Sequence, residues 1–187
     1  MKLILASASP RRRELLEKTG LPFEVIVSAC DETLPAGTPA HRAAELLSIR
    51  KAEAVAKEHP DATVIGADTT VLCDDRVLGK PADRADCIRM MHMLSGRTHL
   101  VQTGCTILSG AQRVSFTAET EVTFYPLTDA EIEAYADSDE PYDKAGGYGI
   151  QGQGGLLIEG IRGDYYNVVG LPVARLLREL RKIGANA

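Results

Sequence analysis

The chain has 187 residues, of which 44% are hydrophobic and 25% charged, and its formal net charge is −5. A chain of this size and composition can bury a core without disulfides, so we expect a single domain over residues 1–187, with room for two lobes. The acidic balance disfavours a nucleic-acid polymer as a partner, and no apolar run reaches the ~20 residues that span a bilayer.

The cysteines and histidines suggest neither a disulfide framework nor a zinc site. The cysteines have unrelated spacings, and the histidines form no ligand pair, so we interpret the histidines as surface or partly buried residues. The first apolar stretch is too short for a signal peptide, and reduced thiols in the cytoplasm are therefore expected. The residues concerned are Cys30, Cys73, Cys87, Cys105, His41, His59, His92 and His99.

The first predicted elements are a strand at Leu3–Ala6 and a helix that follows it closely. Ser9 suits the N-cap of this helix and Pro10 its first position. Arg11–Arg13 then fill the first turn, where the helix dipole already supplies about half a positive charge. The segment therefore predicts a bound phosphate or similar anion. The alternative is a basic helix start whose arginine stems cover apolar surface.

Helical spacing separates the three arginines. Arg13 lies one turn before Glu17, so these two are expected to pair on a solvated face. Arg11 and Arg12 lie above the apolar stripe that includes Leu15, and are the arginines expected to face a ligand.

The rest of the chain predicts an α/β fold, with a mixed sheet and flanking helices. Strands and helices alternate in the first half, and two strands that alternate apolar and polar residues are expected to be half-buried. Caps mark three helix starts. The strands are predicted at 23–27, 62–72, 77–81, 100–108, 114–124 and 156–158, and the helices at 39–58 behind Thr38, from Asp83 to about 95, after the capping box Thr128–Glu131, and at 171–183.

Asp68 interrupts an otherwise apolar strand pattern. A buried carboxylate needs partners or a metal, because isolated buried charge is very costly. Inward carboxylates on strands hold metals or activate water, which is the interpretation we favour. The alternative is an aspartate that caps a loop or pairs with an arginine. Gly66 and Ala67 leave space for close approach to the backbone.

Three further positions place charge where a site could use it. Lys51 shares a helical stripe with apolar residues, so its stem is expected on the buried side. Lys80 stands between a glycine and a proline, at a constrained turn. Asp31 and Glu32 follow a strand end, a common place for site residues in α/β proteins. The alternative for each is an ordinary exposed charge.

The segment from Asp143 to Gly155 is too rich in glycine for a regular element, and it matches neither the P-loop nor the dinucleotide fingerprint. Glycine lets a backbone approach a ligand closely, so this segment could form a wall for a planar group. The alternative is a flexible surface loop, against which Tyr148, Ile150 and Leu156 argue, because these side chains are expected to be buried. Together with the cations and carboxylates, the segment suits a nucleoside triphosphate better than an inorganic anion.

Seven motifs, in this order, resemble those of Maf-like nucleotide pyrophosphatases, and the resemblance covers almost the whole chain. They are Ser7-Ala8-Ser9-Pro10-Arg11-Arg12, Asp31-Glu32, Lys51-Ala52, Gly66-Ala67-Asp68-Thr69, Gly79-Lys80-Pro81, Asp143-Lys144-Ala145-Gly146 through Gly149-Ile150-Gln151-Gly152, and Gly170-Leu171-Pro172. The resemblance implies a two-lobed fold with a central cleft, shared with inosine triphosphate pyrophosphatases. It also implies hydrolysis of a nucleoside triphosphate to a monophosphate and pyrophosphate, with Mg²⁺ or Mn²⁺ as cofactor.

The resemblance also implies roles for single residues by motif match. Asp68 corresponds to the proton acceptor, and Glu32 and Asp68 to the metal side. The phosphate-binding positions are Ser7, Arg11, Arg12, Lys51 and Lys80, and the positions linked to base selection are Arg12, Thr69 and Gln151.

The pairing of Thr69 with Gln151 resembles the subgroup that acts on dTTP and UTP. We expect one of these two side chains to bond the pyrimidine edge, since an amide both donates and accepts. Two alternatives stay open: a pyrophosphatase for 7-methyl-GTP or another modified nucleotide, and a non-catalytic nucleotide-binding regulator of cell division. A homodimer is plausible by analogy.

Overall fold

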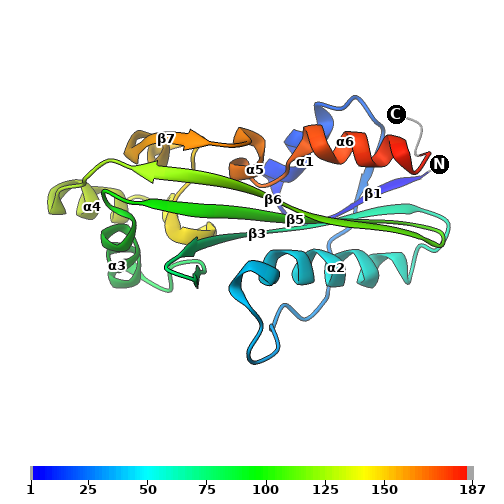
Figure 1. The fold of residues 1–187 in the computed structure, drawn as a ribbon, viewed down its shortest axis with the longest axis horizontal. Helices are drawn as coiled ribbons and strands as arrows, with labels where there is room; N and C mark the ends of the chain where they lie inside the picture. The colour runs from blue at the N-terminus through cyan, green and yellow to red at the C-terminus, as the bar shows by residue number, and fades with distance from the viewer. Residues whose placement is uncertain (1, 185–187) are drawn as a thin grey trace. The chain divides into compact units, whose positions relative to one another are not determined.

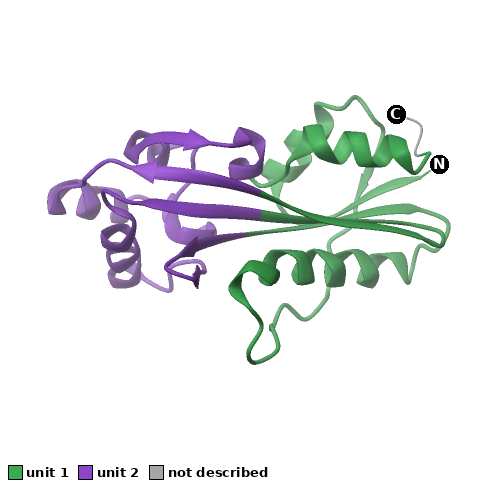
Figure 2. Cartoon of the chain, in the orientation of Figure 1, with its two compact units in different colours: residues 1–69, 103–118, 170–187 green, residues 70–102, 119–169 purple. Residues whose placement is uncertain are grey.

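The structure is a computed structural model that describes residues 2–184. The chain forms two compact units, which Figure 2 colours separately. Unit 1 comprises residues 1–69, 103–118 and 170–187, and unit 2 comprises residues 70–102 and 119–169.

The strands of the described residues form a mixed sheet with the order β2-β1-β3-β5-β6-β7, and β4 pairs with β3 (Figure 1). The pairs β1–β2 and β1–β3 are parallel, whereas β3–β4 and β6–β7 are antiparallel. Three strands, β3 (Thr63–Cys73), β5 (Thr98–Ser109) and β6 (Gln112–Phe124), pass from one unit into the other. The predicted α/β class with a mixed sheet and flanking helices is confirmed.

Unit 1 contains the parallel part of the sheet and three helices. Figure 1 shows α2 on one face of this part of the sheet, and α1 and α6 on the opposite face. The remaining elements of the unit are β1 (Leu3–Ala6), α1 (Pro10–Glu17), β2 (Glu24–Val25), the 3₁₀ turn η1 (Ala40–Arg42), α2 (Ala43–Ala56) and α6 (Val173–Lys182).

The predicted start of α1 is confirmed, but the predicted start of α2 is wrong. The Ser9 hydroxyl accepts a hydrogen bond from the Arg12 backbone N–H at 3.4 Å, with Pro10 at the first position. Thr38, in contrast, caps no helix, because its hydroxyl donates to the Pro35 carbonyl at 2.7 Å. A 3₁₀ turn follows, and α2 begins only at Ala43, without a side-chain cap.

Two glycines let α2 lie close against the sheet. A Cβ at Gly66 on β3 would overlap the backbone of Ser48 and Ala52, and a Cβ at Gly104 on β5 would overlap the backbone of Ala44. The space that the sequence indicates beside Gly66 is therefore filled by a helix of the protein itself. Any side chain at either position would push α2 outward.

Unit 2 contains the antiparallel pairs β3–β4 and β6–β7, packed with short helices. The caps predicted at Asp83 and at Thr128–Glu131 are both present, the latter as a complete capping box. Asp74 and Asp75 form the β3–β4 turn, with φ angles of 50° and 58°. The further elements of unit 2 are β4 (Arg76–Leu78), α3 (Arg84–Leu94), α4 (Asp129–Ala136), η2 (Pro141–Asp143), η3 (Ala145–Gly147), η4 (Gln153–Leu157), β7 (Ile158–Arg162) and α5 (Tyr165–Val169).

Several expectations for this half of the chain need correction. Leu156, expected to be buried, is 81% exposed. The last strand occupies 158–162 rather than 156–158, because residues 153–157 coil into η4. The short helix α5 at 165–169 was not predicted, although the carboxylate of Asp164 caps its start by accepting the Tyr166 N–H at 2.8 Å. Residues 101–107 of β5 are buried on both faces, so this central strand is not half-buried as its alternation indicates.

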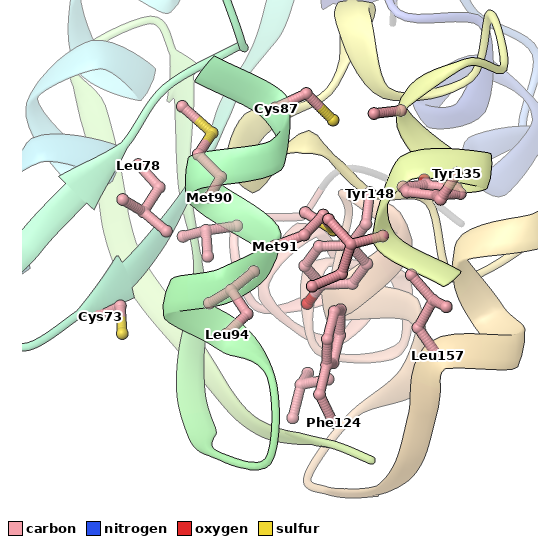
Figure 3. Packing of buried hydrophobic residues seen from close by; sticks show 14 of the residues in the cluster. Cys73, Leu78, Cys87, Met90, Met91, Leu94, Phe124, Tyr135, Tyr148 and Leu157 are labelled. Atoms are coloured by element: carbon pink, nitrogen blue, oxygen red, sulfur yellow. The ribbon is translucent and has the colours of Figure 1, made fainter. Parts of the chain in front are cut away.

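The core of unit 2 packs the apolar faces of α3 and α4 around an aromatic group (Figure 3). Phe124 and Tyr148 meet edge to face at 4.9 Å, and the ring of His99 lies 5.2 Å from that of Phe124. His99 is only 3% exposed, with its Nε2 2.7 Å from the Tyr148 hydroxyl. Its interpretation as a surface or partly buried histidine is therefore wrong. Burial lowers the pKa of His99 from 6.5 to about 4.

The structure also shows the state of the cysteines and the character of the helices. Cys30, Cys73, Cys87 and Cys105 are all free thiols, three of them buried. Among residues 2–184, no helix combines the length and the apolar character that crossing a membrane requires.

We predict that Gly66→Ala destabilises the protein, because its methyl group meets the backbone of α2 rather than a flexible side chain. The expected loss in the free energy of unfolding is about 3 kcal/mol, or roughly 10 °C in Tm. Thermal unfolding followed by circular dichroism measures it. Gly160→Ala is the matched control, since a Cβ there meets no atom within 4 Å. Equal melting temperatures for the two variants would contradict the close packing of α2 against β3 at Gly66.

We also predict that acid weakens unit 2 through His99. Its pKa in the folded state, about 4, lies below the ordinary 6.5, so the unfolded chain takes up the proton first as the pH falls. The contribution is complete above pH 6.5 and is lost between pH 6.5 and 4, which amounts to about 2 kcal/mol by pH 5. Urea unfolding at pH 7 and pH 5 measures the difference. The double variant His99→Leu/Tyr148→Phe should lose this part of the pH dependence, and an unchanged dependence would refute it.

Candidate functional site

In unit 1 the carboxyl end of β1 and the middle of β3 lie side by side. Ala6 pairs with Gly66 in the parallel register, so Ser7 leaves β1 next to the stretch of β3 that carries Asp68 and Thr69. Carboxyl ends of parallel strands are where α/β proteins usually place their ligand sites. The register therefore brings together residues that are about sixty positions apart in the sequence.

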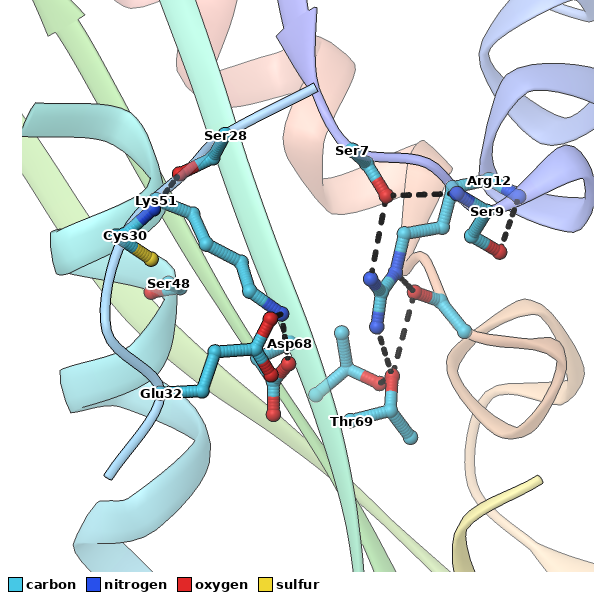
Figure 4. A network of polar contacts seen from close by, with 12 residues as sticks. Ser7, Ser9, Arg12, Ser28, Cys30, Glu32, Ser48, Lys51, Asp68 and Thr69 are labelled. Atoms are coloured by element: carbon cyan, nitrogen blue, oxygen red, sulfur yellow. Dashed lines mark hydrogen bonds and ion pairs between the residues drawn. The ribbon is translucent and has the colours of Figure 1, made fainter. Parts of the chain in front are cut away.

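The Arg12 guanidinium joins three segments of unit 1 (Figure 4). Its Nε donates to the Gly170 carbonyl at 2.9 Å, its Nη2 to the Thr69 hydroxyl at 3.0 Å, and its Nη1 to the Ser7 hydroxyl at 3.3 Å. Burial lowers the pKa of Arg12, and the charge of Asp68 partly opposes that effect. One cation thus fixes the end of β1, the middle of β3 and the segment that precedes α6.

The Thr69 hydroxyl is saturated by this network. Besides Arg12, it lies 2.9 Å from the Thr103 hydroxyl and 3.4 Å from the Gly170 carbonyl. A hydroxyl has one donor and two acceptor positions, and three neighbours use them all. Thr69 therefore contributes to the shape of the site through the protein's own contacts.

Lys51 lies between two carboxylates, as Figure 4 shows. Its ammonium is 2.6 Å from Oδ1 of Asp68 and 3.2 Å from Oε1 of Glu32. The side chains of Lys51 and Asp68 are each 12% exposed, whereas that of Glu32 is 59% exposed. Lys51 does not extend to open solvent, and the buried partner of Asp68 is a lysine rather than an arginine.

The loop that carries Glu32 is held by a residue that the sequence analysis missed. Arg50 donates through Nη1 to the carbonyls of Asp31 and Thr33, at 3.2 and 2.6 Å, on either side of Glu32. The Asp31 carboxylate accepts from the Thr33 N–H at 2.8 Å, and the hydrogen bonds with Thr33 lower the pKa of Asp31. No local pattern could have indicated Arg50, because its partners are carbonyls of a distant loop.

The remaining arginines of the first helix differ in their surroundings. Arg13 pairs with Glu17 at 2.9 Å on the exposed face, so that prediction is confirmed. Arg11 is half-buried. Its contact with phosphate stays a prediction.

The donor set of unit 1 suits a divalent cation that is shared with a substrate. Mg²⁺ is usually held by one or two carboxylates together with substrate phosphates. Glu32 and Asp68 supply two carboxylates that already attract one cation, the ammonium of Lys51. Among residues 2–184, no group of three or more histidine, cysteine, aspartate or glutamate side chains could form an all-protein cage.

Unit 2 contains the other two predicted site residues, Lys80 and Gln151. Both are exposed. The segment around Lys80 is tied to the glycine-rich segment, because the Gly146 N–H donates to the Gly79 carbonyl at 2.9 Å. Within the described part of the chain, no hydrogen bond engages the Gln151 amide, in contrast to the saturated hydroxyl of Thr69.

The fold and these residues define an α/β protein with a candidate site for an anionic ligand and a divalent cation. A family model described as "Maf-like protein" matches residues 2–183, and the chain belongs to this family. The chain is similar to a Bacillus cytotoxicus protein named dTTP/UTP pyrophosphatase, with 50% identity over 186 residues, 100% of this chain and 97% of that protein. It is also similar to a Bacillus anthracis protein of the same name, with 51% identity over 181 residues, 97% of this chain and 95% of that protein.

The solved structure of the Staphylococcus aureus Ham1 protein is a distant match. Its TM-score is 0.45 and its sequence identity 14%, over 66% of this chain and 72% of that chain.

We predict that Thr69→Val destabilises the protein by about 1–3 kcal/mol, because the half-buried Arg12 loses the acceptor of one of its hydrogen bonds. Valine has nearly the same shape as threonine, so the loss reports on the hydroxyl. Thr69→Ser keeps the hydroxyl and should retain most of the stability. Urea unfolding of both variants tests the network, and two equal free energies of unfolding would show that the hydroxyl contributes nothing.

Proposed function

We propose that this protein hydrolyses dTTP and UTP to the monophosphate and pyrophosphate, with Mg²⁺ or Mn²⁺ as cofactor. The observation that carries the proposal is the ion pair between Lys51 and Asp68, next to the network around Arg12. A protein that only binds nucleotides does not need an inward carboxylate in such a place. The names of relatives about 50% identical to this chain support the same substrates.

The products determine where the water attacks. Release of pyrophosphate requires attack on the α-phosphorus, and in our proposal Asp68 accepts the proton of that water. The cationic side chains of Arg11, Lys51 and Lys80, with the hydroxyl of Ser7, offset the charge on the departing pyrophosphate. A divalent cation held by Glu32 and Asp68 would make the attacking water more acidic and screen the phosphate charge.

Base selection is assigned to Gln151 in this proposal. Its amide can donate and accept at the same time, which matches the edge of a uracil or thymine ring. Thr69 and Arg12 then act indirectly, since each is engaged with the other and with Gly170. We also propose that the enzyme works in the cytoplasm, where nucleoside triphosphates are present and buried thiols such as Cys105 stay reduced.

A substrate panel tests the proposal. Pyrophosphate release is measured with dTTP, UTP, CTP, 7-methyl-GTP and ATP, with Mg²⁺ and with Mn²⁺. We expect dTTP and UTP to be turned over with the highest kcat/KM and chelation with EDTA to abolish the reaction. A preference for 7-methyl-GTP would contradict the proposed substrates and identify a pyrophosphatase for that modified nucleotide. Tight nucleotide binding without pyrophosphate release would identify a regulator.

Asp68→Asn should abolish turnover and leave nucleotide binding largely intact. The amide has nearly the same shape and can still accept a hydrogen bond from Lys51, but it cannot take up the proton of the water. Pyrophosphate release and calorimetric titration with a non-hydrolysable UTP analogue measure the two effects separately. Asp61→Asn, at an exposed position outside the site, is the matched control. Pyrophosphate release near the wild-type rate in Asp68→Asn would remove Asp68 from its proposed role.

A further inference from the structure

The glycine-rich segment of unit 2 wraps around side chains of the protein itself. A Cβ at Gly149 would meet the stem of Lys144, one at Gly152 would overlap the carboxylate of Glu140, and one at Gly154 would meet the Tyr135 hydroxyl at 2.7 Å. These glycines are therefore required by close packing inside unit 2. Their role as a wall that approaches a ligand, which the sequence indicates, is not needed to explain them.

Glu140 is the centre of this arrangement. Its Oε2 accepts the N–H of Gln153 at 2.7 Å, and its Oε1 accepts the N–H of Gly154 at 2.9 Å and the hydroxyl of Tyr135 at 3.0 Å. Burial raises the pKa of Glu140, but the hydrogen bonds outweigh that effect and the net direction is downward. Hydrogen bonds to an ionised group are about twice as strong as neutral ones.

Gln151 lies in the turn that these contacts fix. The Gly152 N–H donates to the Gly149 carbonyl at 3.3 Å, so Ile150 and Gln151 are the two central residues of a β-turn. Both ends of the turn pack on the pair Glu140 and Lys144. The two backbone bonds to Glu140 follow the turn immediately.

Lys144 is held independently of the Glu140 carboxylate. Its ammonium donates to the Glu140 backbone carbonyl at 2.6 Å and to Asp143 at 2.5 Å. Removal of the carboxylate therefore leaves Lys144 with both partners and frees the turn and the two N–H groups after it. This separates the effect of Glu140 from that of its neighbour.

We propose that Glu140 is a positioning residue for Gln151: its carboxylate anchors the turn from Gly149 to Gly152 and so determines base preference without contact with the nucleotide. The proposal rests on the function of Gln151 proposed above. A side chain on an anchored turn pays less ordering entropy on binding than one on a loose loop. Loss of the anchor should weaken recognition of the base more than it slows the chemical step.

The test measures kcat and KM for UTP and CTP by pyrophosphate release at saturating Mg²⁺. Glu140→Ala should raise the KM for UTP about tenfold or more, which corresponds to one hydrogen bond to a charged group, with a much smaller change in kcat. The preference for UTP over CTP should fall to that of Gln151→Ala. The double variant Glu140→Ala/Gln151→Ala should show the same preference as Gln151→Ala alone, because the two residues act as one unit.

Three further variants separate positioning from a general structural effect. Glu140→Gln keeps one carbonyl acceptor and should lie between wild type and Glu140→Ala, and it replaces Glu140→Ala if that variant does not fold. Tyr135→Phe removes one donor to Glu140 and leaves both backbone bonds, so its effect on preference should be smaller. Asp139→Asn, at the exposed neighbouring position, should match wild type.

The outcomes distinguish this inference from the proposed function. If Gln151→Ala loses the preference for UTP while Glu140→Ala and Glu140→Gln keep it, the positioning role is overturned and the proposed function stands. If the wild type releases no pyrophosphate from UTP or dTTP, the proposed function fails and the positioning role in base preference fails with it. Amide exchange at Gln153 and Gly154 then still reports whether Glu140 anchors the turn.

Discussion

The close contact between α2 and the sheet is the constraint on which the candidate site depends. Gly66 lies two residues before Asp68 on β3, and it faces the backbone next to Lys51 on α2. The absence of a Cβ at Gly66 therefore determines the distance at which the lysine and the aspartate meet. An ion pair with both side chains 12% exposed is costly to form, and it holds together only if the geometry is accurate.

This pair also gives the site a built-in charge balance. One ammonium lies beside two carboxylates, so the group of Lys51, Asp68 and Glu32 has a formal charge of −1. In the function proposed above, a divalent cation bound together with a triphosphate would change that balance, because Lys51 could then turn from the carboxylates to the phosphates. In that proposed function, the same lysine would be a counter-ion without substrate and a phosphate ligand with it, which would account for a buried lysine better than stability does.

The arginines of the first helix have different partners, because helical geometry points their side chains in different directions. Helical spacing places Arg13 with Glu17 on the solvated face, and this could be derived from the sequence. The inward direction of Arg12 followed from the same argument, but its partners did not. Two of them, Thr69 and Gly170, lie on segments whose proximity depends on the strand order. The positive charge of the first helical turn is thus offset in part by carbonyl and hydroxyl oxygens of the protein.

Features with a local cause could be predicted from the sequence, and features with a distant cause could not. The caps at Ser9, Asp83 and Thr128 depend on neighbouring backbone N–H groups, and all three are present. Thr38 is a threonine like Thr128, but its hydroxyl donates to the Pro35 carbonyl instead of accepting from a helix N–H. The preference of threonine for the N-cap therefore predicted a helix start that is not there. The contacts of Arg50 depend on where a distant loop lies, and no pattern in the sequence reports that.

The glycine-rich segment shows how such a distant cause changes an interpretation. Read alone, its glycines indicate either flexibility or close approach of a ligand, since both need a missing side chain. In the structure, side chains from α4 and from the residues just after it occupy the space beside three of these glycines. Glycine here makes an ordered turn possible, because only a chain without Cβ atoms can pass so near a carboxylate and donate its backbone N–H groups to it. Among residues 2–184, no hydrogen bond engages the Gln151 amide on this ordered turn, whereas Thr69 uses its hydroxyl within the fold. The two positions that the family resemblance links to base selection therefore differ in their surroundings.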